Sequence, residues 1–501
     1  MCKKFLKMKI LFSCGNAPGL PTGYGGQGLL ALLGFKGHKT TVLAWNLTQP
    51  NFKPFIEYST EDVLRINPQM QTIMDCRNAH EIDWSTIRWM CNPYTNYPAP
   101  IRKQDLNKMI LDVHADLFVT LQDIFMFEPG PFACLSAVWM PLHFIPVEHP
   151  TVLALSDFDI QLPISGWGAM LLYPLQSQGE STWRHIQVLG HGRDIQVFRP
   201  VKDDEERFRV REKWNWPQDA FVCLLIASNS EESGRKAFDA QLQAFAEYAK
   251  INPKAWLHIH SEVVRAYDLG RLLETFGLFS SRYSWTDFTD ARFRTHRDAI
   301  IVGENVSITP SMSLLNISEK EIAAVYRSVD VLLAATCSEG CGVPILEAQL
   351  CGTPVITTRA TAMWEETHFG ISVKPLQWIA RMDFNSGWYL PNSKGICKAL
   401  EDISSWTPEE KEKKFQNVLP LLIKEFSNES IVQKWQSILE LVEKKTYCLG
   451  KERLEFLSMI QEFARRSHVL SNIVKIFDES KKTLMDTYKK EQVLGELKLL
   501  L

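Results

Sequence analysis

Short apolar runs alternate with helical patterns along most of this chain, and this alternation is the strongest constraint on its fold. KILFSCG (9–15) indicates a strand, the apolar stretch QGLLALLGFKG indicates a helix, and TTVLAW (40–45) indicates the next strand. This order predicts a parallel sheet, because parallel neighbours need a long crossover connection between them. The same pattern predicts further buried strands at DLFVTLQ (116–122), MPLHFIPV (140–147) and IQLPISG (160–166).

A second block of the same alternation begins after the charged, proline-bounded segment 198–217. Its predicted strands, which have helices between them, are FVCLLIAS (221–228), WLHIH (256–260), DAIIVG (298–303), VDVLLAAT (329–336) and PVITT (354–358). The sequence therefore predicts an α/β protein in which two Rossmann-like, doubly wound domains, 1–205 and 206–445, face each other across a cleft. Apolar residues at helical spacing predict a C-terminal helical extension over 446–501.

Composition argues against several function classes. The net charge of −3 gives no overall attraction to nucleic acid or to an anionic membrane. No run approaches the roughly 18 apolar residues of a membrane span, and the start MCKKFLKMKILFSCG indicates a first strand rather than a signal peptide. The 11 cysteines are scattered, so we expect buried thiols and a cytoplasmic location rather than disulfides or a zinc site.

The segment CSEGCGVPILEAQLCGTPVI (337–356) places Glu339 and Glu347 in a nearly uncharged run. It follows a predicted buried strand, so its first residues form a turn at the carboxyl end of the sheet. Pro344 suits the first turn of a helix and Gly352 suits its left-handed end. This geometry predicts Glu339 in the loop above the sheet and Glu347 in the first turn of the helix, facing the same cleft.

The chemistry of this loop fits a phosphate flanked by hydroxyl groups. Backbone N–H groups and the helix N-terminus attract an anion such as a diphosphate, and Gly340 and Gly342 permit a close approach. Carboxylates only accept hydrogen bonds, so their partners would be the hydroxyls of a ribose or a sugar. These features predict a nucleotide-sugar pocket. The alternative is that Glu347 only complements the helix dipole and Glu339 is an exposed loop residue.

The run EGCGVPILEAQLCGTPVI resembles the signature of the retaining family-4 glycosyltransferases, whose two-Rossmann architecture is called GT-B. That signature combines a Glu-Gly-x-Gly loop, a second glutamate eight residues after the first, and a Cys-Gly-x-Pro-Val-Ile ending. Weaker matches occur in the family's order at PTGYGGQGLL (21–30), HGRDIQVFRP (191–200) and SGRKAFDAQLQAFA (233–246). The resemblance covers about 9–445.

The resemblance implies a role for each matching residue. Glu339 would touch the transferred sugar, and Arg235 and Lys236 would neutralise the leaving diphosphate. Glu347 would bind the nucleotide ribose. The implied donor-binding set is Glu347, Gly340, Cys341, Gly342, Val343, Gly25 and Gly26. Cys341 stands where the family often has an aromatic residue, so the wall beside the sugar differs.

Other residues are weaker candidates. His149 or Glu148, in PVEHP, would lie near the acceptor, and Glu365 or Glu366 would lie near the donor. Aromatic residues could stack on a glycan or simply pack in the core; these are Trp84, Trp89, Tyr94 and Tyr97. The segment IRKQDLNKMI (101–110) is a possible basic-apolar membrane contact.

No metal or other cofactor is expected, because the family needs none. Three polar sets nevertheless have spacings that could suit a metal, although structural roles are favoured for them: Asp157 with Asp159; Asp112, His114 and Asp116; and His258 with His260.

The predicted function is transfer of a sugar, with retention of configuration, from a nucleoside-diphosphate donor to a hydroxyl of a glycan, glycoconjugate or lipid-linked acceptor. The expected partners are a nucleotide sugar and that acceptor, without nucleic acid. One alternative is a catalytically inactive GT-B relative that acts as a glycan-binding or complex subunit, and another is a sugar-nucleotide epimerase. A dehydrogenase is disfavoured, because no acidic residue ends the second strand.

Overall fold

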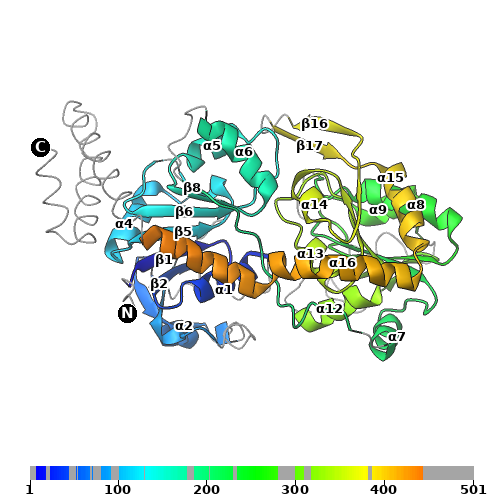
Figure 1. Cartoon of the computed structure of the whole chain (residues 1–501), viewed down its shortest axis with the longest axis horizontal. Helices are drawn as coiled ribbons and strands as arrows, with labels where there is room; N and C mark the ends of the chain where they lie inside the picture. The colour runs from blue at the N-terminus through cyan, green and yellow to red at the C-terminus, as the bar shows by residue number, and fades with distance from the viewer. Residues whose placement is uncertain are drawn as a thin grey trace, which may run out of the picture.

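The structure is a computed structural model of the whole chain. It describes residues 7–18, 23–44, 52–53, 55–67, 70–71, 81–91, 101–128, 130–177, 185–201, 204–229, 234–279, 300–309, 318–381 and 386–443. Figure 1 shows two α/β lobes side by side, the first built by the N-terminal half of the chain and the second by the C-terminal half. The helical extension predicted over 446–501 lies outside the described residues.

The first domain is built on an eight-stranded sheet with the order β3-β4-β2-β1-β5-β6-β7-β8. Its strands are β1 (Lys9–Cys14), β2 (Lys39–Ala44), β3 (Glu57–Ser59), β4 (Ile87–Cys91), β5 (Leu117–Leu121), β6 (Leu135–Met140), β7 (Ile160–Pro163) and β8 (His185–Ile186). All neighbours pair in parallel except β3 with β4. The helical segments are α1 (Gly23–Gly34), α2 (Thr60–Ile66), η2 (Trp84–Thr86), α4 (Lys103–Asp112), η3 (Ile124–Met126), α5 (His149–Leu155) and α6 (Gly166–Ser177).

The second domain has a seven-stranded sheet with the order β11-β12-β10-β9-β13-β14-β15. Its strands are β9 (Phe221–Ile226), β10 (Ala255–His260), β11 (Ile300–Ile301), β12 (Val306–Thr309), β13 (Val331–Ala334), β14 (Val355–Thr358) and β15 (Gly370–Val373). The helices are α7 (Asp204–Lys213), α8 (Phe238–Ile251), α9 (Leu269–Thr275), α12 (Glu319–Ser328), α13 (Val343–Leu350), α14 (Thr361–Glu366), α15 (Ser393–Ser404) and α16 (Pro408–Phe426). A hairpin, β16 (Gln377–Arg381) and β17 (Ser386–Leu390), extends toward the first domain (Figure 1).

The predicted α/β class with two Rossmann-like sheets is confirmed, but one predicted strand is wrong. Of the predicted run 140–147, only Met140 is in a strand, as the last residue of β6 (Leu135–Met140), and 141–147 form the loop that follows. Pro141 and Pro146 explain the error, because a proline has no N–H to donate to a central ladder. The apolar residues of this loop contact the second domain, where the backbone N–H of Ile145 donates to Gly387 O at 3.3 Å.

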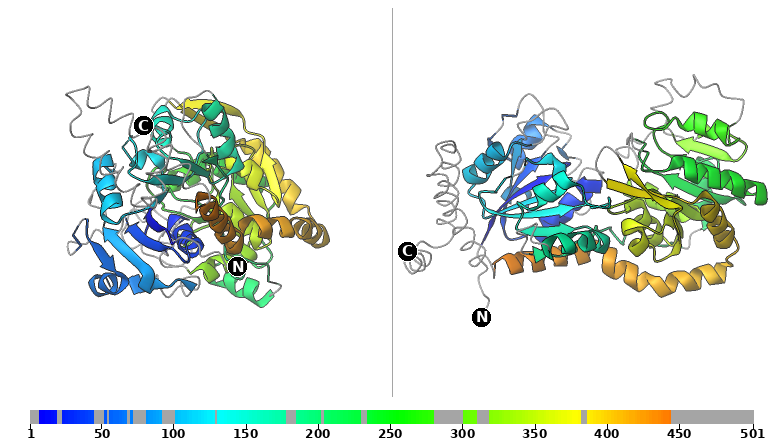
Figure 2. Two further views of the ribbon diagram at one scale, coloured as in Figure 1. Left: turned by 60° about the vertical axis from the view of Figure 1, so that its left-hand side comes forward. Right: turned by 90° about the horizontal axis from the view of Figure 1, so that it is seen from above.

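Two crossings of the chain connect the domains and lie against each other. The backbone N–H of Arg193 donates to Phe426 O at 2.7 Å, and that of Asn428 donates to Arg193 O at 3.0 Å. A helix over 428–443 then runs back beneath the first domain (Figure 2). Trp435 is fully buried in the first domain's core, 5.0 Å from the ring of Phe35. The limits 1–205 and 206–445 stay predictions, but this helix packs with the first domain although it follows the second in sequence.

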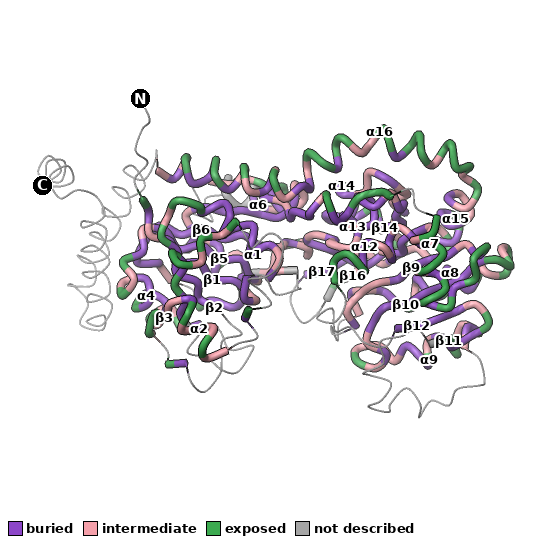
Figure 3. Tube along the Cα trace, turned by 90° about the horizontal axis from the view of Figure 1, so that it is seen from below, coloured by how far each residue is buried: buried purple, intermediate pink, exposed green. Residues whose placement is uncertain are grey.

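Burial follows the sheets, which Figure 3 shows as buried strands beneath half-exposed helices. The proposed membrane contact at 101–110 is wrong, because its apolar residues face inward: Ile101, Leu106, Met109 and Ile110 are all 0% exposed. Among the described residues no helix is long and apolar enough to span a membrane.

Candidate active site

Glu339 is held by two cations in the loop that follows β13. Its Oε2 atom lies 2.8 Å from Arg235 Nη1, and its Oε1 atom lies 2.7 Å from Lys236 Nζ. Arg235 Nη1 also donates to Ser338 O at 2.6 Å. The glutamate is only 8% exposed, so the structure brings these three predicted residues together as a nearly buried triad.

The charge state of Glu339 follows from this triad. Burial alone would raise the pKa of its carboxyl, but the Arg235 and Lys236 cations outweigh burial and lower the pKa to about 2. Glu339 is therefore an anion at every physiological pH. It can accept hydrogen bonds from hydroxyl groups and stabilise positive charge, but it cannot donate a proton.

Residues in the left-handed backbone region position both sides of the triad. Thr361 has φ 51°, an uncommon value for a β-branched residue, and its Oγ1 accepts the backbone N–H of Glu339 at 3.0 Å. Arg235 and Lys236 lie between Gly234 (φ 73°) and Ala237 (φ 47°), just before α8. This tight path between β9 and α8 turns both cations toward the loop after β13.

Glu347 is paired with a residue from the crossing between the domains. Arg193 Nε lies 2.7 Å from Glu347 Oε1, and the Tyr326 hydroxyl donates to Oε2 at 2.9 Å. The side chains of the ion pair are only 9% and 13% exposed. Burial is the largest influence on the pKa of Glu347 and raises it, whereas the Arg193 cation and the Tyr326 hydroxyl lower it in part. Because α13 begins at Val343, Glu347 lies in the helix's second turn rather than the predicted first.

The glycines of the N-terminal loop lie next to Arg193. Gly25 and Gly26 are in the first turn of α1, and a Cβ atom on Gly26 would be 4.0 Å from Arg193 Nη1. The following residue, Gln27, is fully buried and makes two 2.9 Å hydrogen bonds to the backbone of Gly192. The predicted glycine loop and the pair Arg193–Glu347 are therefore parts of one site.

The glycines of the loop between β13 and α13 contact protein atoms closely. A Cβ atom on Gly340 would lie 2.5 Å from Pro141 Cβ, in the loop after β6, so Gly340 permits an approach of the two domains. The N–H of Gly342 donates to Glu366 Oε2 at 3.1 Å. Cys341 is a half-buried free thiol, and Val343 is the first residue of α13.

Glu365 and Glu366, adjacent in sequence, have different partners. Glu365 crosses to the first domain, where its carboxylate accepts the N–H groups of Gly166 and Trp167 at 2.7 and 2.8 Å, at the start of α6. Glu366 is only 5% exposed and points inward to Gly342. Burial raises the pKa of Glu366 to about 8, so it is largely protonated at neutral pH.

The Glu366→Gln variant is expected to be more stable than wild type above pH 5. A raised carboxyl pKa gives stability that is fully present below the ordinary value of 4.5 and is lost as the pH rises through about 8. A glutamine keeps an acceptor for the Gly342 N–H without this loss. Thermal melts from pH 4 to 9 measure the effect, and Glu274→Gln, at an exposed position of α9, is the control. A variant that melts at or below the wild-type temperature at pH 8 would contradict the assignment.

Comparisons with known proteins agree with this architecture. The family model described as "Glycosyl transferases group 1" matches residues 290–381, a segment that contains Glu339, Glu347, Glu365 and Glu366. No curated protein sequence matches the chain. The solved sucrose-phosphate synthase from Thermosynechococcus elongatus is 14% identical, over 87% of this chain and 99% of that one, with a TM-score of 0.53.

Two further solved structures match the chain with similarly low identity and similarly high coverage. A glycosyltransferase from Rickettsia africae is 13% identical over 87% of this chain and 99% of its own, with a TM-score of 0.56. Anabaena Alr3699/HepE, in complex with UDP and glucose, is 13% identical over 86% and 99%, with a TM-score of 0.53. The chain has the GT-B fold. The group 1 match and the GT-B fold together support a glycosyltransferase.

The two residues predicted to lie near the acceptor, Glu148 and His149, come after β6. Glu148 is half-buried at the end of the loop after β6, the same loop whose Pro141 contacts Gly340. His149 begins α5, but the position of its side chain lies outside the described residues. The structure thus places Glu148 in the loop that contacts the second domain and His149 at the start of α5, and their roles stay predictions.

Most residues of the other polar sets have structural partners in this GT-B chain, although both ring nitrogens of His260 are buried without a hydrogen-bond partner among the described residues. Asp159 Oδ2 accepts the N–H of Ser136 at 2.9 Å, and Asp157 accepts the N–H of Gly130. His258 lies between the hydroxyls of Ser307 and Thr309. Asp112 pairs with Lys108, and Asp116 accepts the backbone N–H of Lys9. Within the described ranges, no group of three or more His, Cys, Asp or Glu could hold a metal ion.

The structure describes two of the four aromatic candidates, Trp84 and Trp89. Trp89 is 0% exposed and donates to Thr60 Oγ1 at 3.0 Å, so it belongs to the core. Trp84 is half-buried and stacks on Trp89 with ring centroids 6.1 Å apart. Tyr94 and Tyr97 lie outside the described residues. Packing therefore accounts for the two aromatic residues that the structure describes.

Sequence reasoning missed several residues of this GT-B site: Gln27, Arg193, Tyr326 and Thr361. A signal was present for two of them. Gln27 is the only strongly polar side chain in the run GYGGQGLLALLG, and Arg193 occupies the variable position of the His-Gly-x-Asp segment. No local sequence pattern marks Tyr326 or Thr361, because their place in the site depends only on tertiary hydrogen bonds to Glu347 and Glu339.

Proposed function

We propose that this chain is a retaining, family-4-like glycosyltransferase that moves a sugar from a nucleoside-diphosphate donor to an acceptor hydroxyl. The observation that carries the proposal is the triad of Glu339, Arg235 and Lys236. It places a permanently ionised carboxylate and two cations at the carboxyl end of the second sheet, beside a loop that contacts the first domain. Ligands of open α/β sheets bind at this edge.

The proposed mechanism assigns a task to each member of the triad. As the bond between the sugar and the diphosphate breaks, negative charge grows on the leaving group, and Arg235 and Lys236 stabilise it. Glu339 accepts hydrogen bonds from the sugar hydroxyls. The acceptor hydroxyl then attacks from the face that the leaving group occupies, and the departing phosphate takes its proton. No metal or other cofactor is required in this scheme, and the complex of Anabaena Alr3699/HepE with UDP and glucose supports a nucleotide-sugar donor.

Glu347 is proposed to recognise the nucleotide ribose. Among the described residues, each of its two oxygens has one protein partner, and a carboxylate has about four lone-pair sites, so two acceptor sites would accept ribose hydroxyls. Arg193 and Tyr326 fix the carboxylate's orientation before the ligand arrives. Preorganisation of this kind lowers the entropy cost of binding.

Ligand stabilisation tests the donor site. UDP, GDP and ADP, and then their sugars, are added to the whole chain, and the specific nucleotide should raise the melting temperature in a saturable way. Its 2′-deoxy form should bind about tenfold more weakly, the effect of losing about one hydrogen bond to a charged group. Glu347→Gln should reduce that difference.

Anomeric NMR of the donor and the product then checks whether configuration is retained. The proposal fails if no nucleoside diphosphate shifts the melting temperature and no nucleotide sugar is consumed. Product formed without any acceptor would instead indicate an epimerase.

A further inference from the structure

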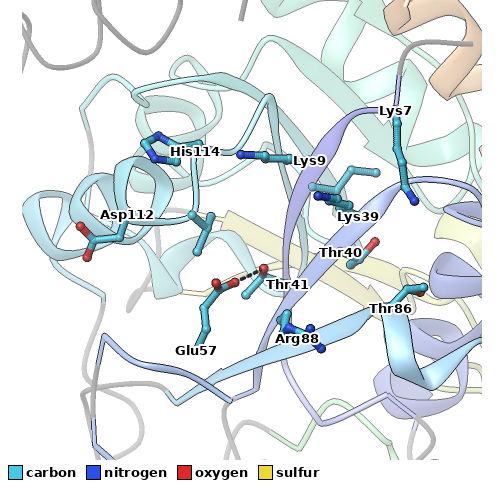
Figure 4. A pocket seen from close by; sticks show the side chains of 12 residues that line it. Lys7, Lys9, Lys39, Thr40, Thr41, Glu57, Thr86, Arg88, Asp112 and His114 are labelled. Carbon is cyan, nitrogen blue, oxygen red and sulfur yellow. Dashed lines mark hydrogen bonds between the residues drawn. The ribbon is translucent and has the colours of Figure 1, made fainter. Parts of the chain in front are cut away.

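A cavity of about 370 Å³ opens at the amino-terminal edge of the first sheet. Lys9 and Lys39 are the first residues of the parallel strands β1 and β2, and Arg88 is near the start of the adjacent strand β4. Figure 4 shows these side chains around the cavity, together with Lys7 and His114. The loops after β6 and β7 that contact the second domain leave the opposite edge of the sheet, so the cavity is separate from the candidate active site.

The cavity carries an excess of positive charge. Lys7, Lys9, Lys39 and Arg88 all line it, and among the described residues no carboxylate lies within ion-pair distance of any of them. Among the described residues, two acidic side chains line the same space and both already have partners, while the carboxylate of Asp116, outside the lining, accepts the backbone N–H of Lys9 at 2.7 Å. Glu57 Oε1 accepts the Thr41 hydroxyl at 2.6 Å, and Asp112 pairs with Lys108 outside the lining.

The remaining lining determines what kind of anion would fit. Thr40 supplies a hydroxyl group, whereas the hydroxyls of Thr41 and Thr86 already donate to Glu57 Oε1 and Asp83 O. Among the described lining residues, only Ile10 and Val113 are apolar. Ammonium, guanidinium and hydroxyl donors match the several acceptor oxygens of a phosphate group. Among the described lining residues there is no Phe, Tyr or Trp ring on which a base could stack, and His114 supplies the one imidazole.

We propose that this cavity binds the phosphate group of a small anionic ligand. The group would bridge the cations of β1, β2 and β4, while the Thr40 hydroxyl donates to one of its remaining oxygens. Both a phosphorylated metabolite and the phosphate headgroup of a lipid carry this chemistry. The cavity is at the amino-terminal edge of the first sheet, and the residues assigned to sugar transfer lie beyond the opposite edge. The ligand would therefore act as an effector or an anchor rather than as a substrate.

Calorimetric titration of the whole chain with inorganic pyrophosphate tests the site. The variant Lys9→Gln/Lys39→Gln/Arg88→Gln is compared with Lys36→Gln/Lys413→Gln/Lys424→Gln, which removes the same charge from exposed positions outside the cavity. The cavity variant should lose at least about tenfold in affinity at one site, since it removes three cationic hydrogen-bond donors. The control should change it less than about twofold. Equal weakening in both variants would show diffuse surface charge and overturn the proposal, as would an unchanged isotherm in the cavity variant.

The donor site and the source of the phosphate are separated by two further measurements. If the donor site also binds pyrophosphate, the wild type shows two sites and the cavity variant retains one. If the proposed function is wrong, the wild type shows only the site that the cavity variant loses. Flotation with phosphatidylcholine vesicles containing phosphatidic acid then distinguishes the sources. Vesicle binding that the cavity variant loses indicates a lipid headgroup, and its absence alongside an intact pyrophosphate site indicates a soluble ligand.

Discussion

Glu339→Gln is expected to reduce kcat for sugar transfer by about two to three orders of magnitude, the usual effect of removing one preorganised electrostatic partner of the transition state. Nucleotide binding should respond differently. In the wild type the Glu339 carboxylate occupies Arg235 and Lys236 at 2.8 and 2.7 Å, so an incoming diphosphate competes with it for both cations. Without the negative charge this competition ends, and the Kd for the nucleoside diphosphate should stay the same or fall.

The same variant should be less stable than wild type at neutral pH. Removing one partner of a buried ion pair costs about 3–5 kcal/mol, because the remaining charge is left without compensation. The matched control is Glu247→Gln in α8, whose pair with Lys250 is exposed and should contribute less than about 1 kcal/mol. Chemical denaturation gives both values, and saturating nucleotide should restore part of the loss in Glu339→Gln.

The pH dependence supplies an independent check on Glu339. Its folded pKa is lowered from 4.5 to about 2, so the stability it contributes is present above pH 4.5 and is lost as the pH falls through about 2. The gap in unfolding free energy between wild type and Glu339→Gln should therefore narrow on acidification across that window. A Glu339→Gln enzyme with wild-type kcat, or a gap that is constant with pH, would show that the triad is assigned incorrectly.

The local structure of the segment from β13 through α13 could be predicted from sequence because its signals are local. Pro344 lies in the first turn of α13, and Gly352, at the predicted helix end, has φ 80°. Glycine and proline restrict or permit backbone angles by their own covalent structure, so their positions hold without knowledge of the rest of the fold. The basic pair Arg235 and Lys236 could be placed near Glu339 only through the family resemblance.

The tertiary partners could not be predicted in the same way. Glu365 and Glu366 are adjacent, but a helix turns neighbouring residues to different directions, so one reaches Gly166 in the first domain and the other Gly342 in its own. The helix over 428–443 follows the second domain in sequence, yet Trp435 completes the core of the first. An amphipathic pattern shows that a helix has an apolar face but not which surface covers it.

Arg193→Met is the variant with the second largest expected effect. Arg193 lies at the crossing between the domains, and its guanidinium is the cation beside the half-buried Glu347. Its loss should lower the unfolding free energy by about 3–5 kcal/mol at pH 8 and weaken nucleotide binding, since Glu347 is no longer held in place. The control is Arg271→Met, which removes an exposed pair with Asp268 and should cost less than about 1 kcal/mol.

The penalty of Arg193→Met should depend on pH in a defined direction. Burial already raises the pKa of Glu347, and losing the Arg193 cation raises it further. A carboxyl with a raised folded pKa gives stability that is present below 4.5 and is lost as the pH rises through the folded value. The unfolding free energy of the variant should therefore be close to that of wild type near pH 5 and lower than that of wild type at pH 8. At pH 8 the Glu347 carboxyl, without its cation, either ionises or retains a proton, and both states cost free energy.

A double-mutant cycle separates this ion pair from a simple loss of packing. If the cost of Arg193→Met is the stranded carboxylate, then Arg193→Met/Glu347→Gln should be more stable at pH 8 than Arg193→Met alone, and its stability relative to wild type should vary less with pH. Glu347→Gln alone leaves Arg193 unpaired in the same buried position, so it too should be less stable than the double variant. If the two single costs simply add, the contact between Arg193 and Glu347 contributes no coupling energy. The crossing between the domains would then be held by its backbone hydrogen bonds to Phe426 and Asn428 rather than by this ion pair.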